Sequence, residues 1–250
     1  MDTDPITFIK SRLPFGVVSF FFPQDREIIK FLGRELKKGP LGMLVLDAGC
    51  GLGQYRKLVK GGYIALDLSR RAGCNIDVVG DLLNIPAKDS AFDRILCLQV
   101  LEHVKEPITL LKELRRVLKP GGDLLLTAPQ GWGEHMKPED YFRFTSYGLR
   151  HLAGQAGMEV SSIEPLGGFF NYLGNRIQYI PLVAFSRVKN GFWRLMVLPF
   201  KLAGAVIFSL LLGPLTSLLD ILDGERDFTL NYGCVFKKKG ADRSAPLGLL

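Results

Sequence analysis

The chain has 250 residues, of which 47% are hydrophobic and 23% charged, and this composition excludes a mainly disordered protein. The formal net charge of +7 favours an anionic surface or substrate, but so modest an excess does not by itself indicate nucleic acid. The four cysteines lie far apart without a CxxC pair, so we expect free thiols, no metal site and a cytoplasmic protein.

Five short apolar segments follow an N-terminal helical pattern that spans 25–39 and ends at Gly39. The segments are residues 43–46, 63–69, 76–86, 92–104 and 122–130. They alternate with helical patterns and are almost continuously apolar, which predicts a parallel sheet with both faces covered. In the helix before the fifth strand, Pro120 and the two glycines that follow it are expected to end the helix.

The C-terminal half contains a further helix, a sixth strand at 158–167, a long apolar region at 169–222 and a last strand. We therefore divide the chain into five parts. They are an N-terminal helical segment (1–40), a core (41–165), an apolar helical insertion (166–228), the last strand (229–239) and a tail (240–250).

A glycine-rich turn follows the first strand and is the main clue to function. Gly49, Gly51 and Gly53 allow tight backbone geometry and close approach of a ligand to main-chain N–H groups. Asp67 lies twenty residues after Asp47, at the end of the next strand. A doubly wound fold places an acid there to accept hydrogen bonds from ribose hydroxyls.

Taken together, these segments resemble the class I S-adenosylmethionine-dependent methyltransferases, in particular the methyltransferase type 11-like group with a VLEHV motif. The resembling segments are LDAGCGLG (46–53), ALD (65–67), GDLLNIPAKDSAFD (80–93), QVLEHV (99–104) and LRRVLKPGGDLLLTAP (114–129). The resemblance implies an α/β fold: a Rossmann-like, seven-stranded sandwich whose last strand is antiparallel, with the apolar helical insertion before that strand.

The resemblance also implies a site for S-adenosyl-L-methionine made from eight residues. They are Asp47, Gly49, Gly51, Gly53, Asp67, Asp81, Leu82 and Gln99. Asp47 and the glycine turn would hold the methionine part of the cofactor, and Asp67 would bind both ribose hydroxyls. Asp81 and the backbone of Leu82 would meet the adenine edge. Gln99 would lie beside the sulfonium.

The loop after the fifth strand, residues 131–149, is expected to face the acceptor, because ligands bind at this edge of open α/β sheets. Trp132, Tyr141 and Arg143 are candidate substrate-binding residues. His135 is the candidate general base, since its ordinary pKa lies near neutrality. The alternative is a structural loop that ends in a helix cap at Thr145 or Ser146.

Glu102 and His103 form a conspicuous acid–imidazole pair within the VLEHV motif. Because they stand at the start of a helical segment, we interpret them as capping and packing residues rather than as catalytic ones.

Residues 202–219 carry no charge, and eighteen residues are near the lower limit for crossing a bilayer. The last strand must return to the sheet, so a single crossing is excluded, and the preceding part of the insertion is too charged for a second. Gly213-Pro214 is expected to break this helix. In a continuous helix, one narrow stripe of mainly small residues would contain Lys201, Ala205, Ser209, Gly213 and Ser217, and the opposite, broad apolar face would contain Leu211, Leu215 and Leu218.

We therefore expect 192–222 to form a monotopic or shallowly re-entrant anchor on the cytoplasmic membrane face. A homodimer interface or a core helix is the alternative. The basic residues expected near anionic headgroups are Arg187, Lys189, Arg194 and Lys201.

The functional hypothesis is methyl transfer from S-adenosylmethionine to a lipid-linked or membrane-located small molecule or glycan. Methyl transfer needs little acid–base machinery, since the sulfonium is already activated and alignment supplies much of the rate. Two alternatives stay open: a non-catalytic, cofactor-binding regulatory module and an RNA methyltransferase. The sequence has no basic stripe with interleaved aromatic residues, so a nucleic-acid partner is not expected.

Overall fold

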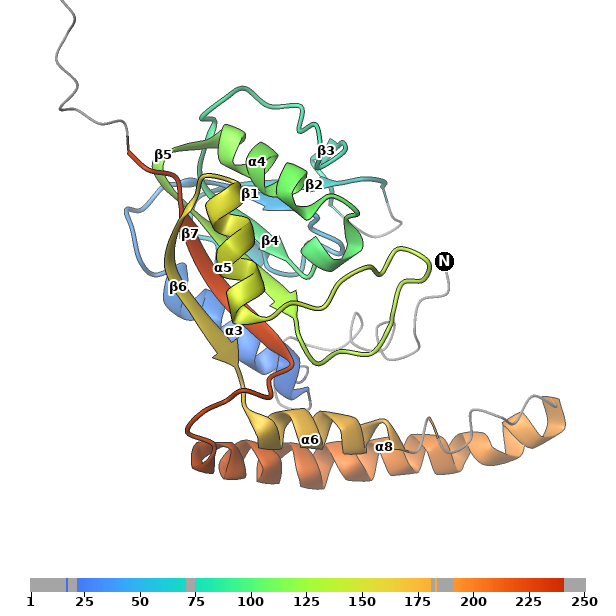
Figure 1. The fold of residues 1–250 in the computed structure, drawn as a ribbon. Coiled ribbons are helices and arrows are strands. Elements are labelled where there is room, and N and C mark those ends of the chain that lie inside the picture. The colour runs from blue at the N-terminus through green and yellow to red at the C-terminus, as the bar shows by residue number, and fades with distance from the viewer. Residues whose placement is uncertain (1–16, 18–21, 71–74, 181–182, 184–190, 241–250) are drawn as a thin grey trace, which may run out of the picture. The chain divides into compact units, whose positions relative to one another are not determined.

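The computed structural model describes residues 17, 22–70, 75–180, 183 and 191–240 (Figure 1). They fall into two compact units. Unit 1 comprises the described parts of Met1–Leu32, Pro129–Met136 and Pro165–Tyr232, and unit 2 those of Gly33–Ala128, Lys137–Glu164 and Gly233–Leu250. Unit 2 holds the sheet apart from some strand ends, and unit 1 holds most of the apolar insertion.

Seven strands form one sheet in the order β3-β2-β1-β4-β5-β7-β6. They are β1 (Leu44–Ala48), β2 (Gly62–Asp67), β3 (Val78–Val79), β4 (Phe92–Leu98), β5 (Leu118–Pro129), β6 (Glu159–Leu166) and β7 (Asn231–Lys237). The first five strands pair in parallel. This is the predicted seven-stranded α/β sheet, with the switch between β1 and β4 that parallel crossovers produce.

Strand β7 runs antiparallel to β5, as the resemblance implied. At one end, Gly121 and Lys238 are joined by a backbone hydrogen bond of 2.9 Å. At the other end, the N–H of Gln130 donates to the carbonyl of Leu230 at 3.0 Å. The paired residue numbers rise along β5 and fall along β7, which fixes the antiparallel direction.

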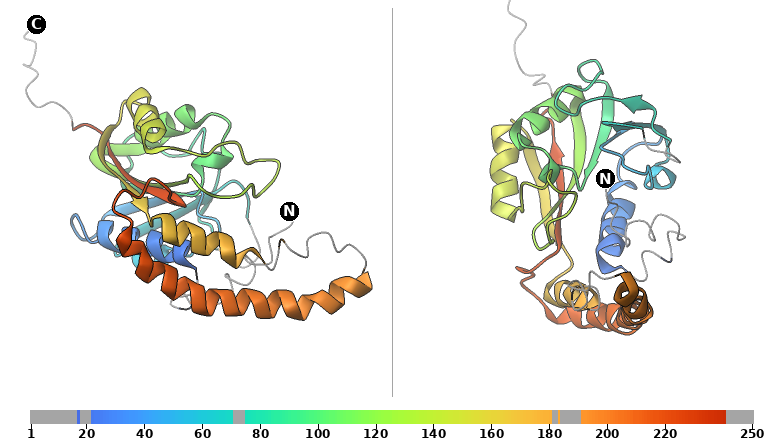
Figure 2. Two further views of the ribbon diagram at one scale, coloured as in Figure 1. Left: turned by 60° about the horizontal axis from the view of Figure 1, so that its bottom comes forward. Right: turned by 90° about the vertical axis from the view of Figure 1, so that its right-hand side faces the viewer.

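Two helices pack together in unit 2: α4 (Pro107–Val117) and α5 (Ser146–Gln155) (Figure 2). Leu111 and Leu114 on one face of α4 are fully buried, as are the central leucines of β5. Thr145 caps α5, since its hydroxyl accepts a hydrogen bond from the Gly148 N–H at 3.1 Å.

Three predicted boundaries in the sheet are wrong. The third strand is only Val78–Val79, because Asp81 starts a turn in which its carboxylate accepts the Leu83 N–H at 2.9 Å. The fourth ends at Leu98, because Gln99 has a φ of 56°, which an extended strand cannot continue. Helix α4 already ends at Val117, so Pro120 and the glycines lie in β5 instead of ending the helix.

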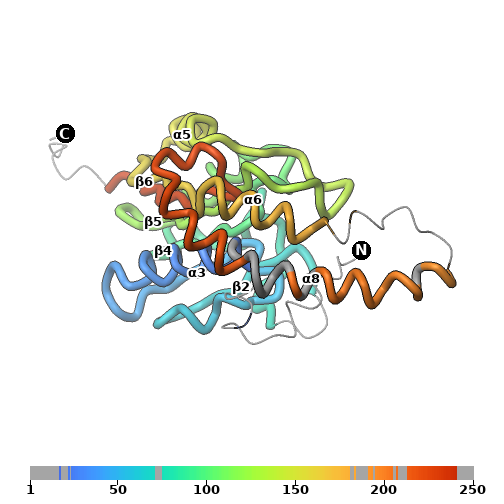
Figure 3. Tube along the Cα trace, turned by 90° about the horizontal axis from the view of Figure 1, so that it is seen from below, coloured from blue at the N-terminus to red at the C-terminus, as the bar shows by residue number. Residues whose placement is uncertain are grey.

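Unit 1 contains part of α3 (Pro23–Glu35), then α6 (Phe169–Gln178), α8 (Gly191–Leu219) and η3 (Asp220–Leu222). Helix α6 lies along the C-terminal half of α8 (Figures 1 and 3). The helices approach so closely that a Cβ on Gly174 would lie 2.4 Å from the Thr216 hydroxyl. The Asp220 carboxylate accepts the Gly168 N–H at 2.9 Å and the Asn171 N–H at 3.0 Å, which stabilises the start of α6.

The predicted break at Gly213-Pro214 is wrong, because α8 is continuous and contains both Pro199 and Pro214. A helix-interior proline costs about 3 kcal/mol, and the close packing of Thr216 on Gly174 of α6 helps to offset that cost. Gly213 is buried while Leu215 and Leu218 are exposed, as predicted for these three positions, and the side chains of Ala205, Ser209 and Leu211 lie outside the described residues. Among the described residues, no helix is long and apolar enough to cross a membrane.

Candidate functional site

The glycine turn follows β1 at the carboxyl end of the sheet. Gly49, Gly51 and Gly53 have φ values of 78°, 56° and 64°, a region that other L-residues rarely adopt. A Cβ on Gly49 would lie 2.5 Å from the Val100 side chain, so this glycine permits close packing. A Cβ on Gly51 would meet no described atom within 4 Å, so the turn has open space beside Gly51.

Asp67 ends β2 and contacts this turn. Its carboxylate accepts the Gly51 N–H at 2.8 Å, and the residue is only 8% exposed. A carboxylate can accept several hydrogen bonds, so this contact leaves acceptor capacity for a ligand. The strand register therefore brings the predicted ribose-binding acid to the glycine turn.

Asp47, at the end of β1, is almost fully buried, and the Tyr63 hydroxyl donates a hydrogen bond to its carboxylate. Burial raises the pKa of Asp47 to about 6, against the opposing effect of the Tyr63 hydrogen bond, and the charge of Asp67 raises it further. The pKa of Asp47 thus lies well above its ordinary range, and a cationic ligand group beside it would favour its charged form.

The other predicted cofactor residues lie in the same unit, after the next strands. The Leu82 side chain would be 3.5 Å from a Cβ on Gly49. Asp81 is exposed in the turn that follows β3. The Gln99 amide donates to the Thr127 hydroxyl at 3.1 Å, which orients the residue that directly follows β4. The sheet therefore brings the eight predicted residues to its carboxyl edge.

The acceptor candidates are divided between the two units. In unit 2, the Tyr141 N–H donates to the Glu102 carbonyl at 2.8 Å, and Lys105 lies 5.8 Å from the centroid of the Tyr141 ring. Arg143 forms two hydrogen bonds of 2.7 Å with the Asp140 carboxylate. Arg143 is therefore part of a fixed ion pair in this loop.

Trp132 and His135 belong to unit 1. The Trp132 ring packs edge-on against Tyr179 at 5.9 Å, and the Arg176 guanidinium lies 5.4 Å from its centroid. These contacts give Trp132 a packing role on α6. His135 is half-buried, with Nδ1 3.1 Å from the Gly133 carbonyl.

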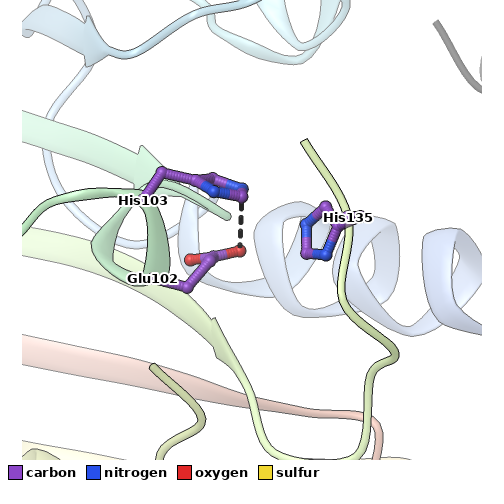
Figure 4. A group of neighbouring side chains, drawn as sticks. All are labelled: Glu102, His103 and His135. Atoms are coloured by element: carbon purple, nitrogen blue, oxygen red, sulfur yellow. Dashed lines mark ion pairs between the residues drawn. The ribbon is translucent and has the colours of Figure 1, made fainter. Parts of the chain in front are cut away.

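Glu102 does not cap a helix, so the capping part of that interpretation is wrong, whereas its full burial agrees with the packing part. Glu102 and His103 lie in η2 (Leu101–His103), and Glu102 is 0% exposed. Neither of its carboxyl oxygens has a hydrogen-bond partner on another described residue, and the His103 Nε2 is 3.8 Å away (Figure 4). Burial raises the pKa of Glu102 to about 8, so the carboxyl is mostly neutral at neutral pH.

Comparison with known proteins agrees with this site. A family model described as "Methyltransferase domain" matches residues 46–126. "Probable tRNA methyltransferase 9B" of Mus musculus is 35% identical over 96 residues, which are 34% of this chain and 21% of that protein. Cycloartenol-C-24-methyltransferase 1 of Oryza sativa is 34% identical over 119 residues, 38% of this chain and 34% of that protein.

Among solved structures, phosphoethanolamine N-methyltransferase 2 of Haemonchus contortus has a TM-score of 0.50 at 17% identity, covering 84% of this chain and 52% of that chain. At this identity the likeness concerns the fold alone. The matched segments span between a fifth and a half of the first curated relatives. The family-model match at 46–126 includes the glycine turn, Asp47 and Asp67.

Proposed function

We propose that this chain, which contains a class I S-adenosylmethionine-dependent methyltransferase domain, transfers a methyl group from S-adenosylmethionine to an acceptor at a membrane surface. The observation that carries the proposal is the open glycine turn with Asp47 and Asp67 beside it. A flexible cationic cofactor needs its ribose held by an acid and its ends held by backbone groups, and this edge offers both.

The residues at this edge fit the cofactor in chemistry. Asp67 would accept hydrogen bonds from the ribose hydroxyls, and Asp47 with the glycine turn would hold the methionine part. Asp81 and Leu82 would bind the adenine edge, and Gln99 would lie beside the sulfonium. S-adenosylmethionine supplies an activated methyl group, so the chain has mainly to align the acceptor with it.

Trp132, Tyr141 and Arg143 remain the proposed acceptor-binding residues, with His135 as the base for a hydroxyl acceptor. Substitution His135→Ala should lower turnover more than it weakens cofactor binding, because a base acts on the acceptor proton. Equal turnover of the variant and the wild type with the true acceptor would remove His135 from the site.

The proposed membrane contact rests on the first half of α8. Seven large apolar side chains there are 45% to 69% exposed: Phe192, Trp193, Leu195, Met196, Leu198, Phe200 and Leu202. At 100° per residue they spread over roughly 220° of the helix circumference, and Lys201 falls in the remaining sector. A broad apolar arc with a basic residue opposite it suits a helix that lies at an anionic lipid surface, so we propose lipid as the occupant.

Charge around this helix favours an anionic membrane. Residues 165–219 contain no Asp or Glu and five basic residues. These are Arg176, Arg187, Lys189, Arg194 and Lys201, of which Arg187 and Lys189 lie outside the described residues. Each basic residue near an anionic surface contributes on the order of 1 kcal/mol to binding. A shallowly re-entrant anchor on the cytoplasmic face, where thiols stay reduced, fits this pattern.

Flotation with phosphatidylcholine vesicles, with and without phosphatidylglycerol, tests the membrane contact. The protein should float with the anionic vesicles, and the triple substitution Phe192→Ser, Trp193→Ser, Phe200→Ser should abolish flotation. The matched control is Leu41→Ser with Tyr147→Ser, which removes side chains that are 87% and 83% exposed in unit 2. No flotation, together with a concentration-dependent dimer that the triple variant loses, would instead support a homodimer interface.

Incubation with methyl-labelled S-adenosylmethionine and separated membrane, soluble and RNA extracts tests the activity. Label should enter the membrane lipid fraction. An RNA acceptor is the second candidate, favoured by the similarity to a protein named a tRNA methyltransferase. Label in RNA, with binding to bulk tRNA that weakens steeply with salt, would establish it. Tight cofactor binding without label in any fraction would indicate the non-catalytic module.

A further inference from the structure

Glu102 is a buried carboxyl that the proposed chemistry leaves unused. Both oxygens lack a hydrogen-bond partner on another described residue, although the residue is fully buried. Such an arrangement is costly for a charged carboxylate and cheaper for a neutral acid. The carboxyl therefore holds a proton inside the protein that a change in its surroundings can release.

The charged groups beside Glu102 have opposing effects on its carboxyl. The His103 Nε2 lies 3.8 Å from Oε1, and the Asp140–Arg143 pair acts on Glu102 with opposite signs. The Cys97 thiol is fully buried nearby, and burial raises its pKa, so it stays neutral. The Asp140–Arg143 pair carries no net charge, so an arriving cation would have a large effect on Glu102.

The position of Glu102 links it to the candidate cofactor site within unit 2. Gln99 directly follows β4, and Val100 packs against the glycine turn at Gly49. Glu102 follows in η2, and its backbone carbonyl accepts a hydrogen bond from the Tyr141 N–H. The carboxyl is thus a few residues from the strand end expected to lie beside the sulfonium.

We propose that Glu102 is a charge-sensing, specificity-determining residue of the cofactor site: its carboxyl releases its proton to solvent when a sulfonium ligand binds and keeps it when a neutral thioether binds. The proposal rests on the proposed function. S-adenosylmethionine and S-adenosylhomocysteine share the amino, carboxylate and adenosine groups, so their difference isolates the sulfonium charge. Ionised Glu102 would favour the substrate form of the cofactor over its product.

Calorimetry of both ligands at about pH 7, in two buffers of different ionisation enthalpy, measures the protons released on binding. S-adenosylmethionine should release more protons than S-adenosylhomocysteine, by roughly half to one proton per site. In Glu102→Gln this difference should vanish while the affinity for S-adenosylhomocysteine stays within about twofold, because Gln mimics the neutral acid. The matched control is Glu139→Gln, which neutralises an exposed carboxyl of the same unit and should leave the difference intact.

The wild-type protein gives a second measurement that does not depend on folding of the variant. Its affinity ratio, S-adenosylmethionine over S-adenosylhomocysteine, should rise by about threefold to tenfold per pH unit between about pH 6 and pH 8. A flat ratio, equal proton release by both ligands, or a difference that persists in Glu102→Gln would overturn the charge-sensing role of Glu102 and leave the proposed function intact. If neither ligand binds, the proposed function fails as well.

Discussion

Asp47 and Asp67 are both buried acids at the ends of neighbouring strands, yet their partners differ. A tyrosine hydroxyl bonds to Asp47, whereas a backbone N–H of the glycine turn bonds to Asp67. Asp67 is thus connected directly to the turn where the ligand is expected. Single substitutions at this edge should therefore separate residues that bind the cofactor from residues that only hold the fold.

Asp67→Ala should abolish measurable binding of S-adenosylmethionine. Loss of a charged acceptor for two ribose hydroxyls costs roughly 2–4 kcal/mol. Calorimetry measures the affinity, and circular dichroism checks the fold. Asp89→Ala, which removes a carboxylate whose side chain is 76% exposed, is the control. An affinity of Asp67→Ala within about threefold of the wild type would contradict the ribose role, since one hydrogen bond to a charged group is worth more.

Gly51→Val should also prevent cofactor binding, through the positive φ of 56° and the side chain placed in the open space beside the turn. Gly121→Val is a matched control, because Gly121 has a φ of 79° and equally open surroundings but lies in β5. Both variants should lose similar stability in thermal unfolding, and only Gly51→Val should lose binding. Equal binding by the two would show that this turn does not face the ligand.

The free energy of unfolding of the ligand-free protein should fall as pH rises from about 5 to 8. The pKa of Glu102 is raised from 4.5 to about 8, and that of Asp47 from 3.8 to about 6. At a pH between the ordinary and the raised pKa of either group, the folded chain holds a proton that the unfolded chain has released. Each group therefore lowers the free energy of unfolding by at most about 1.4 kcal/mol per pH unit. Urea unfolding across this range measures the slope.

In Glu102→Gln the slope between about pH 6 and pH 8 should flatten, because Asp47 has then already titrated. Glu102→Leu should be more stable than the wild type at about pH 8, since it removes a buried polar group without partners among the described residues. A Leu variant that is less stable at that pH would mean that Glu102 makes a stabilising contact.

At the scale of elements, α6 and α8 show how packing decides the course of a helix. The chain between 191 and 219 contains two prolines, yet it forms one helix, whose C-terminal half lies on α6. Hydroxyl groups of Thr216 and Ser217 also bond to the Gly213 carbonyl, at 3.2 Å and 2.7 Å. The pairing of these two helices therefore depends on small side chains at the contact.

Gly174→Val should separate α6 from the end of α8, because even a Cβ there would lie 2.4 Å from the Thr216 hydroxyl. Overpacking of this kind costs about 1–3 kcal/mol. Hydrogen exchange of residues 211–219 should become faster, while exchange in β1 and β4 should not change. Gly154→Ala in α5 is the control, since its Cβ would meet no described atom within 4 Å and should stabilise the helix by up to about 1 kcal/mol. Unchanged exchange in Gly174→Val would contradict the close approach.

At the scale of the whole molecule, the sheet order and the edge that carries the candidate cofactor site could be predicted because their signals are local. Apolar runs mark the strands, glycines mark the turn after the first, and an acid marks the end of the second. Sequential parallel strands place these signals at one edge without information from distant residues. The antiparallel last strand came from the family resemblance rather than from the pattern itself.

Tertiary structure decided what depends on contacts between distant segments. The sequence shows a Glu-His pair, but only the structure shows that Glu102 is fully buried, with its carbonyl bonded to the N–H of Tyr141 from a distant loop. Pro214 predicts a break, but packing on α6 keeps α8 continuous. The loop after β5 reads as one acceptor-facing segment, yet Trp132 packs with α6 in unit 1 while Arg143 pairs with Asp140 in unit 2. Burial and pairing are set by which surfaces meet, and no local pattern encodes that.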